Sequence, residues 1–553
     1  MDSRLLIARH WLPQLYLFEY KSCTFYSRRQ FHDYFVTHLP SSSLHPDSRS
    51  AGGPHHKLPR SASKPHTPKS KDPSPAPLVG VTRDTTVVRI PLRSAKHHFG
   101  VSVSRGTRPY NEDAYQAGVI ELPAFAKRAP VSLTRAPTSS PLQAFRERRQ
   151  QEQQQRNPED AEGEATSAEG ASGDPQVFYF GVFDGHGGTV CSDFLKESLH
   201  SYIEETATEF DLKSSLRASQ PKDGVSDRSK AIRNNPAEQT VPQEASVARA
   251  LSLQSSLIKE WRNTVGGYFR RFKPAAFLDS DNPTAVTISN VLTYSFLRAD
   301  LDFVTAQARK SGSESDPVLS DAAINASDDL NSPLRQIGGP KRFKGGSTCS
   351  VALISTPSPT PFWHPASPST LVTSHVGDTR ILLCRTRNGE AVRLTMDHHP
   401  DNPIEGERLR KYAASFVTDS FGEERMSGLA NTRAFGDMAS KRQGVSAEPE
   451  IRRIELNPAE YSFLVLVSDG ISGTLSDQEV VDIVKEAKTP EQGSRDVVSF
   501  ATEVSVEGDN ATCLVVRLGG WERRSEGGLG SMGTREARDW RKQEAANPRS
   551  RQT

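Results

Sequence analysis

Short runs of apolar and β-branched residues recur along the chain, and each is bounded by turn-forming residues. Runs of this length and composition predict strands. They fall at 86–90, 98–104, 177–183, 371–376, 379–384, 461–467 and 511–518. Because 371–376 and 379–384 are separated only by Gly377 and Asp378, this pair predicts a hairpin with those two residues as a structural turn.

Other segments carry apolar residues at helical spacing. They predict helices at 190–199, 255–267, 284–309, 405–414 and 477–486. Strands and helices are gathered in blocks, and a strict strand-helix alternation is missing. The pattern therefore favours an α+β layered fold over a doubly wound parallel sheet.

Polar, low-complexity stretches divide the chain. Residues 1–87 are expected to be a basic N-terminus followed by a disordered linker, 88–520 one folded domain, and 521–553 a disordered charged tail. Three low-complexity stretches inside the domain are expected to be surface insertions. They lie at 135–175, 213–248 and 308–340.

Composition agrees with one core rather than several. The 553 residues include 69 Lys and Arg, 67 Asp and Glu, and only 35% hydrophobic residues, so part of the chain must lie outside any core. The net charge of +2 without a uniformly basic face argues against a nucleic-acid partner. No run of 18 apolar residues occurs, which argues against a membrane span. Five cysteines without a CxxC pair indicate a reducing compartment.

The first 31 residues have the character of an import signal. Basic residues outnumber acidic ones, with aromatic and aliphatic residues between them, and Arg28–Arg29 precede Phe31 as in a matrix-processing site. Import into the mitochondrial matrix is therefore expected. The alternative is a disordered basic tail on a cytoplasmic protein, because Pro13 and Glu19 weaken the helix.

Acidic residues stand where a sheet would bring them together at one end. Asp184 and Asp469 end strands, Asp509 precedes the last strand, and Glu112–Asp113 follow a turn. Clustered carboxylates repel one another unless a cation neutralises them. Oxygen ligands without Cys or His clusters indicate Mg²⁺ or Mn²⁺ rather than zinc, and two such ions suit displacement at phosphorus.

At these residues the sequence resembles the metal-dependent type 2C (PPM) serine/threonine protein phosphatases, over roughly residues 95–519. Several motifs occur in the order of that family, which makes coincidence implausible. They are Arg105–Asp113, Phe183–Gly188, Gly345–Thr348, Gly377–Arg380, Asp397–Arg408, Leu429–Asp437, Ser468–Gly470 and Asp509–Asn510.

The resemblance implies an αββα sandwich of two antiparallel sheets flanked by helices, with two Mg²⁺ or Mn²⁺ ions at one end. By motif position, the implied metal ligands are Glu112, Asp113, Asp184, the carbonyl of Gly185, Asp469 and Asp509, with Asp184 bridging both ions. Arg108 resembles the arginine that binds the substrate phosphate, and His186 the acid that protonates the leaving alkoxide. The implied reaction is direct attack on phosphoserine or phosphothreonine by a water bridging the two ions.

One departure bears on the metals. A third ion is often held in this family by an aspartate at the position of Phe343, so a third metal site is doubtful here. The import signal narrows the resemblance to the fungal mitochondrial members, with phosphorylated matrix proteins as expected partners and a monomer as the expected state. Two alternatives remain open at this point: a pseudophosphatase that serves as a binding module, and a hydrolase of small phosphate esters.

Overall fold

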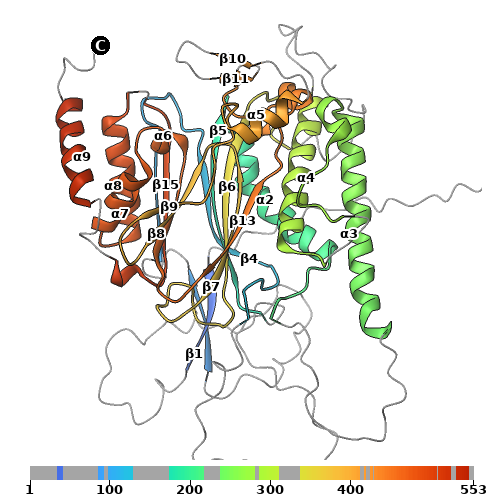
Figure 1. Cartoon of the computed structure of the whole chain (residues 1–553), viewed down its shortest axis with the longest axis horizontal. Coiled ribbons are helices and arrows are strands. Elements are labelled where there is room, and N and C mark those ends of the chain that lie inside the picture. Colours follow the sequence, from blue (N-terminus) through green and yellow to red (C-terminus); the bar gives the residue numbers. More distant parts are fainter. Residues whose placement is uncertain are drawn as a thin grey trace, which may run out of the picture. The chain divides into compact units, whose positions relative to one another are not determined.

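The protein is described from a computed structural model (Figure 1). The described residues are 34–40, 85–91, 98–128, 174–216, 237–279, 285–310, 337–411, 416–418, 424–426, 429–506, 508–524 and 531–546. The chain divides into two units, Met1–Gln30 and Phe31–Thr553. The expected import signal and the central parts of the three expected insertions lie outside the described residues.

Two antiparallel sheets form the centre of the second unit. The six-stranded sheet has the order β13 (Glu450–Leu456), β7 (Ser369–Val376), β6 (Gly346–Ser355), β5 (Val177–His186) and β4 (Ala114–Ile120), with β12 (Phe435–Gly436) also paired to β6. The five-stranded sheet has the order β3 (Phe99–Ser104), β15 (Ala511–Arg517), β14 (Tyr461–Val467), β8 (Arg380–Arg385) and β9 (Ala391–Arg393).

The period-two pattern of the central strands explains how the layers pack. In β5, Phe178 and Phe180 face the core between the sheets, whereas Tyr179 and Phe183 face the helices on the other side. The near-continuous apolar sequence of such a strand is what burial on both faces requires. Strand β14 follows the same rule, so three apolar layers separate four layers of secondary structure.

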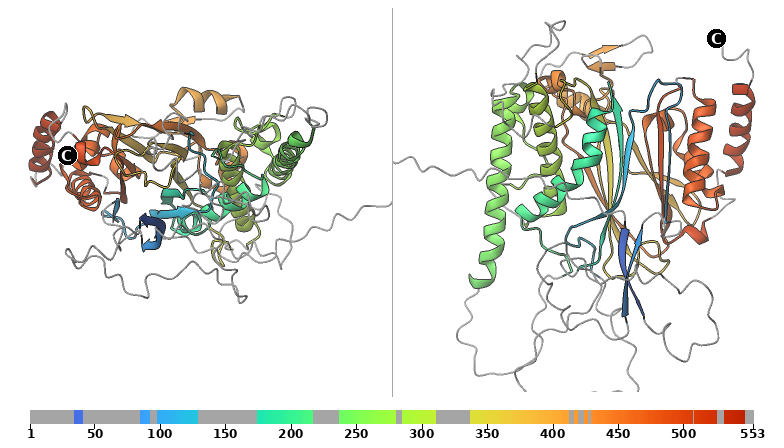
Figure 2. Two further views of the ribbon diagram at one scale, coloured as in Figure 1. Left: turned by 90° about the horizontal axis from the view of Figure 1, so that it is seen from below. Right: turned by 180° about the vertical axis from the view of Figure 1, so that it is seen from behind.

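Helices cover both outer faces (Figures 1 and 2). The six-stranded sheet is covered by α2 (Val190–Glu209) and α4 (Ile288–Ala308), and α3 (Ala237–Thr264) packs against α4 on the side away from the sheet. The five-stranded sheet is covered by α7 (Asp477–Glu486) and α8 (Pro490–Val504). Short α5 (Pro403–Arg410) and α6 (Asp469–Ser472) lie between strands. The expected αββα sandwich is confirmed.

The expected hairpin of 371–376 and 379–384 is wrong. Strand β7 belongs to the six-stranded sheet, whereas β8 belongs to the five-stranded sheet. Gly377 and Asp378 therefore carry the chain from one sheet to the other. A two-residue link between apolar runs is compatible with a hairpin within one sheet and with a crossing from one sheet to the other. The packing of the two sheets decides between these arrangements.

The structure also contains elements that the pattern did not predict. Helix α8 starts at Pro490 with Thr489 as its N-cap, and it packs on β3 and β15. Helix α9 (Ser531–Ala546) lies within the tail that was expected to be disordered. Helix α3 begins at Ala237, inside the expected insertion 213–248. Strand β1 (Tyr34–Pro40) lies within the expected linker and pairs with β2 (Thr85–Pro91), the strand predicted at 86–90.

A polar surface hides α9 from a reading of apolar spacing. Helix α9 is held by charged side chains rather than by an apolar stripe: Arg538 pairs with Glu486 at 2.9 Å and Arg541 with Glu479 at 3.0 Å. Within the described residues, every helix is too short or too polar to cross a membrane.

Candidate metal centre

The predicted site residues meet at one end of the two sheets. Asp184 lies near the end of β5, and Asp469 opens α6 directly after β14. Antiparallel pairing brings the starts of the neighbouring strands to the same end, since Phe183 pairs with Ala114 and Val467 with Cys513. Glu112, Asp113 and Asp509, which precede those strands, are thereby placed beside Asp184 and Asp469.

Three carboxylates form the tightest group among the described residues. One oxygen of each of Asp184, Asp378 and Asp469 lies within 4.8 Å of the other two. The backbone N–H of Asp469 also donates to Asp184 Oδ2 at 3.3 Å. Burial, followed by the charges of Asp469 and Asp113, raises the pKa of Asp184 well above its usual range. Burial and neighbouring carboxylates raise the pKa of Asp469 to about 8. Without a cation, these groups cannot all be ionised at neutral pH.

Asp378 was missed as a site residue because it was assigned to a hairpin turn. Its Oδ2 accepts hydrogen bonds from Asn431 Nδ2 at 2.9 Å and from His399 Nε2 at 3.3 Å. Burial alone would raise the pKa of Asp378, but the hydrogen bond and charge of His399 outweigh it, so the pKa is lowered. One signal was present in the sequence: Asp378, like Asp184 and Asp469, comes just after an apolar strand.

Asp113 lies next to the group formed by Asp184, Asp378 and Asp469, and one of its oxygens is fixed by hydrogen bonds. Its Oδ2 accepts from Ser468 Oγ at 2.8 Å and from Thr512 Oγ1 at 2.6 Å, while its Oδ1 is shielded from solvent and has no hydrogen-bond partner. Burial raises the pKa of Asp113 to about 6. Two donors hold one oxygen, so the other is left for a ligand.

The backbone of Glu112 is fixed by two side chains and lies close to Gly185. The Glu112 N–H donates to Asn510 Oδ1 at 2.8 Å, and its carbonyl accepts from Ser192 Oγ at 2.6 Å. A Cβ on Gly185 would stand 2.5 Å from the Glu112 carbonyl, which is closer than any side chain allows. Glycine is required at this position for the ends of β4 and β5 to approach.

Arg108 lies at the exposed edge of the site. Its guanidinium pairs with Asp509 Oδ2 at 2.7 Å, and its side chain is 52% exposed. An ion pair this exposed adds little to stability. The guanidinium is therefore accessible to an incoming anion.

His186 is paired with Asp437, the last residue of the motif Leu429–Asp437, to which the sequence analysis assigned no role. His186 Nε2 lies 2.9 Å from both carboxylate oxygens of Asp437. Burial lowers the pKa of His186, but the hydrogen bond and charge of Asp437 outweigh it, so the pKa lies above its ordinary value. Asp437 adopts a left-handed backbone conformation, with φ of 43°. This strained conformation is consistent with a functional position.

The position of Phe343 carries no carboxylate, and the ring packs in an apolar contact. It lies 6.3 Å from the ring of Phe303 and 3.0 Å from where a Cβ on Gly188 would stand. An oxygen-ligated ion is not supported by this side chain.

Comparison with known proteins identifies the family. A fission yeast protein, protein phosphatase 2C homolog 4 of Schizosaccharomyces pombe, is 34% identical over 354 residues, covering 63% of this chain and 73% of that protein. The chain belongs to the protein phosphatase 2C family. The family model described as Protein phosphatase 2C matches residues 292–509. The predicted family membership is thus confirmed. The protein is therefore a metal-dependent serine/threonine protein phosphatase, as predicted.

Two further likenesses are partial. The Xenopus laevis protein named protein phosphatase 1K, mitochondrial, is 38% identical over 152 residues, which cover 27% of this chain and 40% of that protein. The crystal structure of a serine-threonine phosphatase 2C from Toxoplasma gondii is similar over 76% of this chain and 94% of that chain, at 16% identity and a TM-score of 0.40.

Proposed function

We propose that this phosphatase hydrolyses phosphoserine and phosphothreonine in proteins at the end of the sheets where Asp184 and Asp469 meet. The observation that carries the proposal is the group of carboxylates whose oxygens lie within 4.8 Å of one another. A pseudophosphatase with a decayed site would lack some of the expected carboxylates, whereas this chain has all of them.

The residues fit a pair of divalent cations. Asp113 presents an oxygen without a hydrogen-bond partner, and burial together with neighbouring carboxylates raises the pKa values of Asp184 and Asp469. We assign the two ions, Mg²⁺ or Mn²⁺, to Glu112, Asp113, Asp184, the Gly185 carbonyl, Asp469 and Asp509. When bound, the ions neutralise these carboxylates and lower the pKa of the water that attacks phosphorus.

Arg108 binds the substrate phosphate in this proposal. A guanidinium can donate two parallel hydrogen bonds to a phosphate, which a lysine cannot. Its pairing with Asp509 holds it at the edge of the carboxylate group. An incoming phosphate and a cation would give both side chains new partners.

His186 donates the proton that the leaving serine or threonine oxygen needs. Its partner Asp437 orients the ring and favours the protonated form. A positioned proton donor of this kind contributes about 10²–10⁴-fold to a rate.

The catalytic test is hydrolysis of a phosphothreonine peptide by the full chain with Mn²⁺, compared with chelator. Asp184→Asn is expected to lose about a hundredfold or more of the Mn²⁺-dependent activity, since even weaker contacts to a metal ligand carry 10- to 100-fold effects. Asp193→Asn, an exposed aspartate in the first turn of α2, is the matched control. Wild-type protein that folds and binds Mn²⁺ without turnover would contradict the proposal.

We also propose mitochondrial phosphoproteins as the substrates. The support is the basic segment 1–31 and the printed name of the frog relative. Residues 1–31 fused to a fluorescent reporter should direct it to mitochondria, and the same fusion with Arg28 and Arg29 changed to Gln should do so less well. A cytosolic wild-type fusion would contradict this part of the proposal alone.

A further inference from the structure

A fully buried ion pair, which we call the buried pair, has no part in the proposed reaction. Lys441 Nζ lies 2.5 Å from Asp300 Oδ2, and both side chains are 0% exposed. Asp300 belongs to α4, and Lys441 to the 3₁₀ helix η6 (Met438–Gln443). The cost of taking two charges out of water can exceed their mutual attraction, so burial of such a pair is weak evidence for a stabilising role. Its other contacts indicate what it does.

Both partners of the buried pair hold backbone groups of one short segment, residues 434–436. Asp300 Oδ1 accepts a hydrogen bond from the Gly436 N–H at 2.9 Å. Lys441 Nζ also donates to the Ala434 carbonyl at 2.7 Å. The segment ends directly before the aspartate that pairs with His186.

The backbone at the end of this segment needs such support. Gly436 has a φ of 74° and Asp437 a φ of 43°, so two consecutive residues are left-handed. A left-handed residue other than glycine persists only where the surrounding structure enforces it. The Asp437 N–H donates to the Gly345 carbonyl at 3.0 Å, and Asp300 accepts from the Gly436 N–H. These two hydrogen bonds fix the two peptide groups that precede the Asp437 Cα.

This conformation lets Asp437 reach His186 across a strand. Gly346 of β6 pairs with His186 of β5 on one side and with Gly436 of β12 on the other. A Cβ on Gly346 would stand 2.5 Å from Asp437 Oδ2, so the carboxylate lies against a glycine. It meets His186 Nε2 at 2.9 Å. Because the carboxylate spans a whole strand, the contact depends on how the backbone before it is held.

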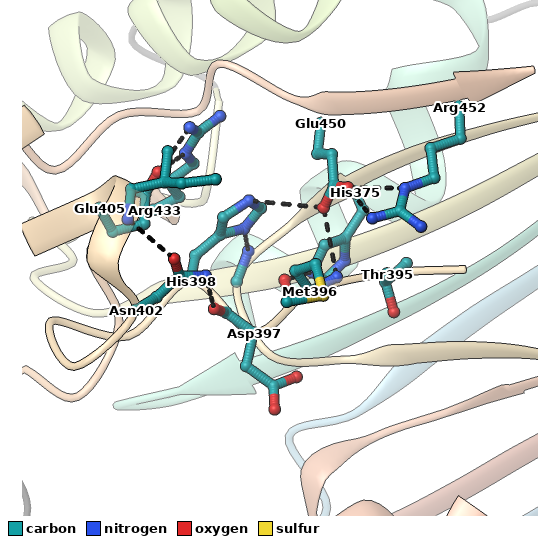
Figure 3. A network of polar contacts seen from close by, with 12 residues as sticks. His375, Thr395, Met396, Asp397, His398, Asn402, Glu405, Arg433, Glu450 and Arg452 are labelled. Carbon is teal, nitrogen blue, oxygen red and sulfur yellow. Dashed lines mark hydrogen bonds and ion pairs between the residues drawn. The ribbon is translucent and has the colours of Figure 1, made fainter. Parts of the chain in front are cut away.

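The residue before the segment is fixed by a separate network (Figure 3). Arg433 pairs with Glu405 at 2.6 Å, and it donates to the Glu448 carbonyl at 2.8 Å. This network fixes the chain where it enters the segment. The buried pair then fixes the segment itself, up to the aspartate that meets His186.

We propose that Asp300 and Lys441 are positioning residues for the proton donor: they fix residues 434–436 so that the Asp437 carboxylate meets the His186 ring. The inference rests on the proposed function, because it needs His186 to protonate the leaving oxygen. It gives α4, which covers the outer face of the six-stranded sheet, an effect on catalysis through side chains that solvent does not reach.

The test compares two double variants of the full chain that both remove the ion pair. In the first, Asp300→Leu with Lys441→Met, apolar side chains replace the charges, a change that folded proteins often tolerate. In the second, Asp300→Asn with Lys441→Met, an oxygen remains that can accept from the Gly436 N–H. Both variants lose the donor to the Ala434 carbonyl, so they differ in the hold on Gly436. Denaturant unfolding establishes that each variant is folded.

The measurement is kcat with Mn²⁺ on a phosphothreonine peptide and on p-nitrophenyl phosphate, whose phenolate leaves without a proton. The first variant should lose about tenfold in kcat on the peptide and less than about threefold on p-nitrophenyl phosphate, as a misplaced proton donor would cause. The second variant should lose no more than about threefold on the peptide. KM should stay close to its wild-type value for both substrates.

Two outcomes would overturn the inference: equal losses on the two substrates in the first variant, or equal peptide losses in the two variants. A folded wild type that binds Mn²⁺ but hydrolyses no phosphothreonine peptide would overturn the proposed function instead.

A second buried pair of the same kind supplies the matched control. Lys485 Nζ lies 2.6 Å from Asp482 Oδ1 within α7, and both side chains are 0% exposed. This pair lies on the helix layer that covers the other sheet. Asp482→Leu with Lys485→Met should leave the ratio of the two kcat values as in wild type. A ratio changed as in the first variant would show a general effect of losing a buried pair, and would overturn the inference.

Lys441→Met alone covers the case in which the first double variant does not fold. It keeps Asp300 and removes the donor to the Ala434 carbonyl. The kcat on the peptide should fall about threefold while the kcat on p-nitrophenyl phosphate stays at the wild-type value. No loss on the peptide, or the same loss on both substrates, would then overturn the inference.

Discussion

His186 shows how one residue pair can be tested apart from the rest of the site. Its contact with Asp437 joins the last residue of β5 to the residue that follows β12, 251 positions further along the chain. The pairing positions the ring, and the hydrogen bond and charge of Asp437 raise the pKa of His186 against the effect of burial. A proton donor matters only when the leaving group needs a proton.

Asp437→Asn should therefore lower kcat about a hundredfold for a phosphothreonine peptide and much less for p-nitrophenyl phosphate, whose phenolate leaves without a proton. The comparison of the two kcat values is the measurement. Equal losses on both substrates would show that Asp437 supports the site as a whole and not proton donation.

Glu405 is a second residue whose role is decided by its partners. Its side chain is 1% exposed and pairs with Arg408 at 2.8 Å and Arg433 at 2.6 Å. Burial alone would raise the pKa of Glu405, yet the charges of Arg433 and Arg408 hold it well below its usual range. Loss of the charge would leave two partly buried guanidinium groups unpaired.

Glu405→Gln should lower the free energy of unfolding by about 3 kcal/mol, the scale for a broken buried ion pair. Glu407→Gln on the same helix is the matched control, since Glu407 pairs with Lys411 while 72% exposed, and it should change little. Denaturant unfolding measures both. A small change in the free energy of unfolding for Glu405→Gln would mean that water solvates the two guanidinium groups in place of the carboxylate.

At the scale of elements, α9 is an example of a helix fixed by its partners rather than by its own pattern. It packs on α7 and α8, and charged and polar side chains link it to them. Thr534 donates to Asp482 at 2.6 Å, and Arg541 donates to the Thr474 carbonyl at 2.8 Å. The second contact reaches the loop after α6, the helix that begins with Asp469.

Arg538→Ala should lower the free energy of unfolding by about 1 kcal/mol, because Arg538 is largely buried where it pairs with Glu486. Arg535→Ala, exposed on the same helix, should stay within about 0.5 kcal/mol of wild type. Equal changes in the free energy of unfolding for the two variants would indicate that the pairing of Arg538 with Glu486 does not stabilise the packing of α9 on α7.

At the scale of the molecule, the two sheets meet at an end where carboxylates are crowded, so the fold carries a cost that a cation relieves. Removal of divalent ions with a chelator should lower the unfolding temperature, and Mn²⁺ at about 100 times its Kd should restore about 2.7 kcal/mol. Calorimetric melting with and without Mn²⁺ measures the difference. An unfolding temperature that is the same with and without Mn²⁺ would contradict ion binding at these carboxylates.

The local sequence determined the strands, the α+β class, the family motifs and most of the acidic residues at strand ends, because period-two patterning and turn chemistry are local properties. It could not determine which sheet a strand joins. The separation of β7 from β8, the place of Asp378 against Asp184 and Asp469, and the pairing of His186 with Asp437 all depend on contacts between distant segments. Helix α9 was hidden for a related reason: its stability comes from ion pairs with α7, which only the tertiary structure brings within reach.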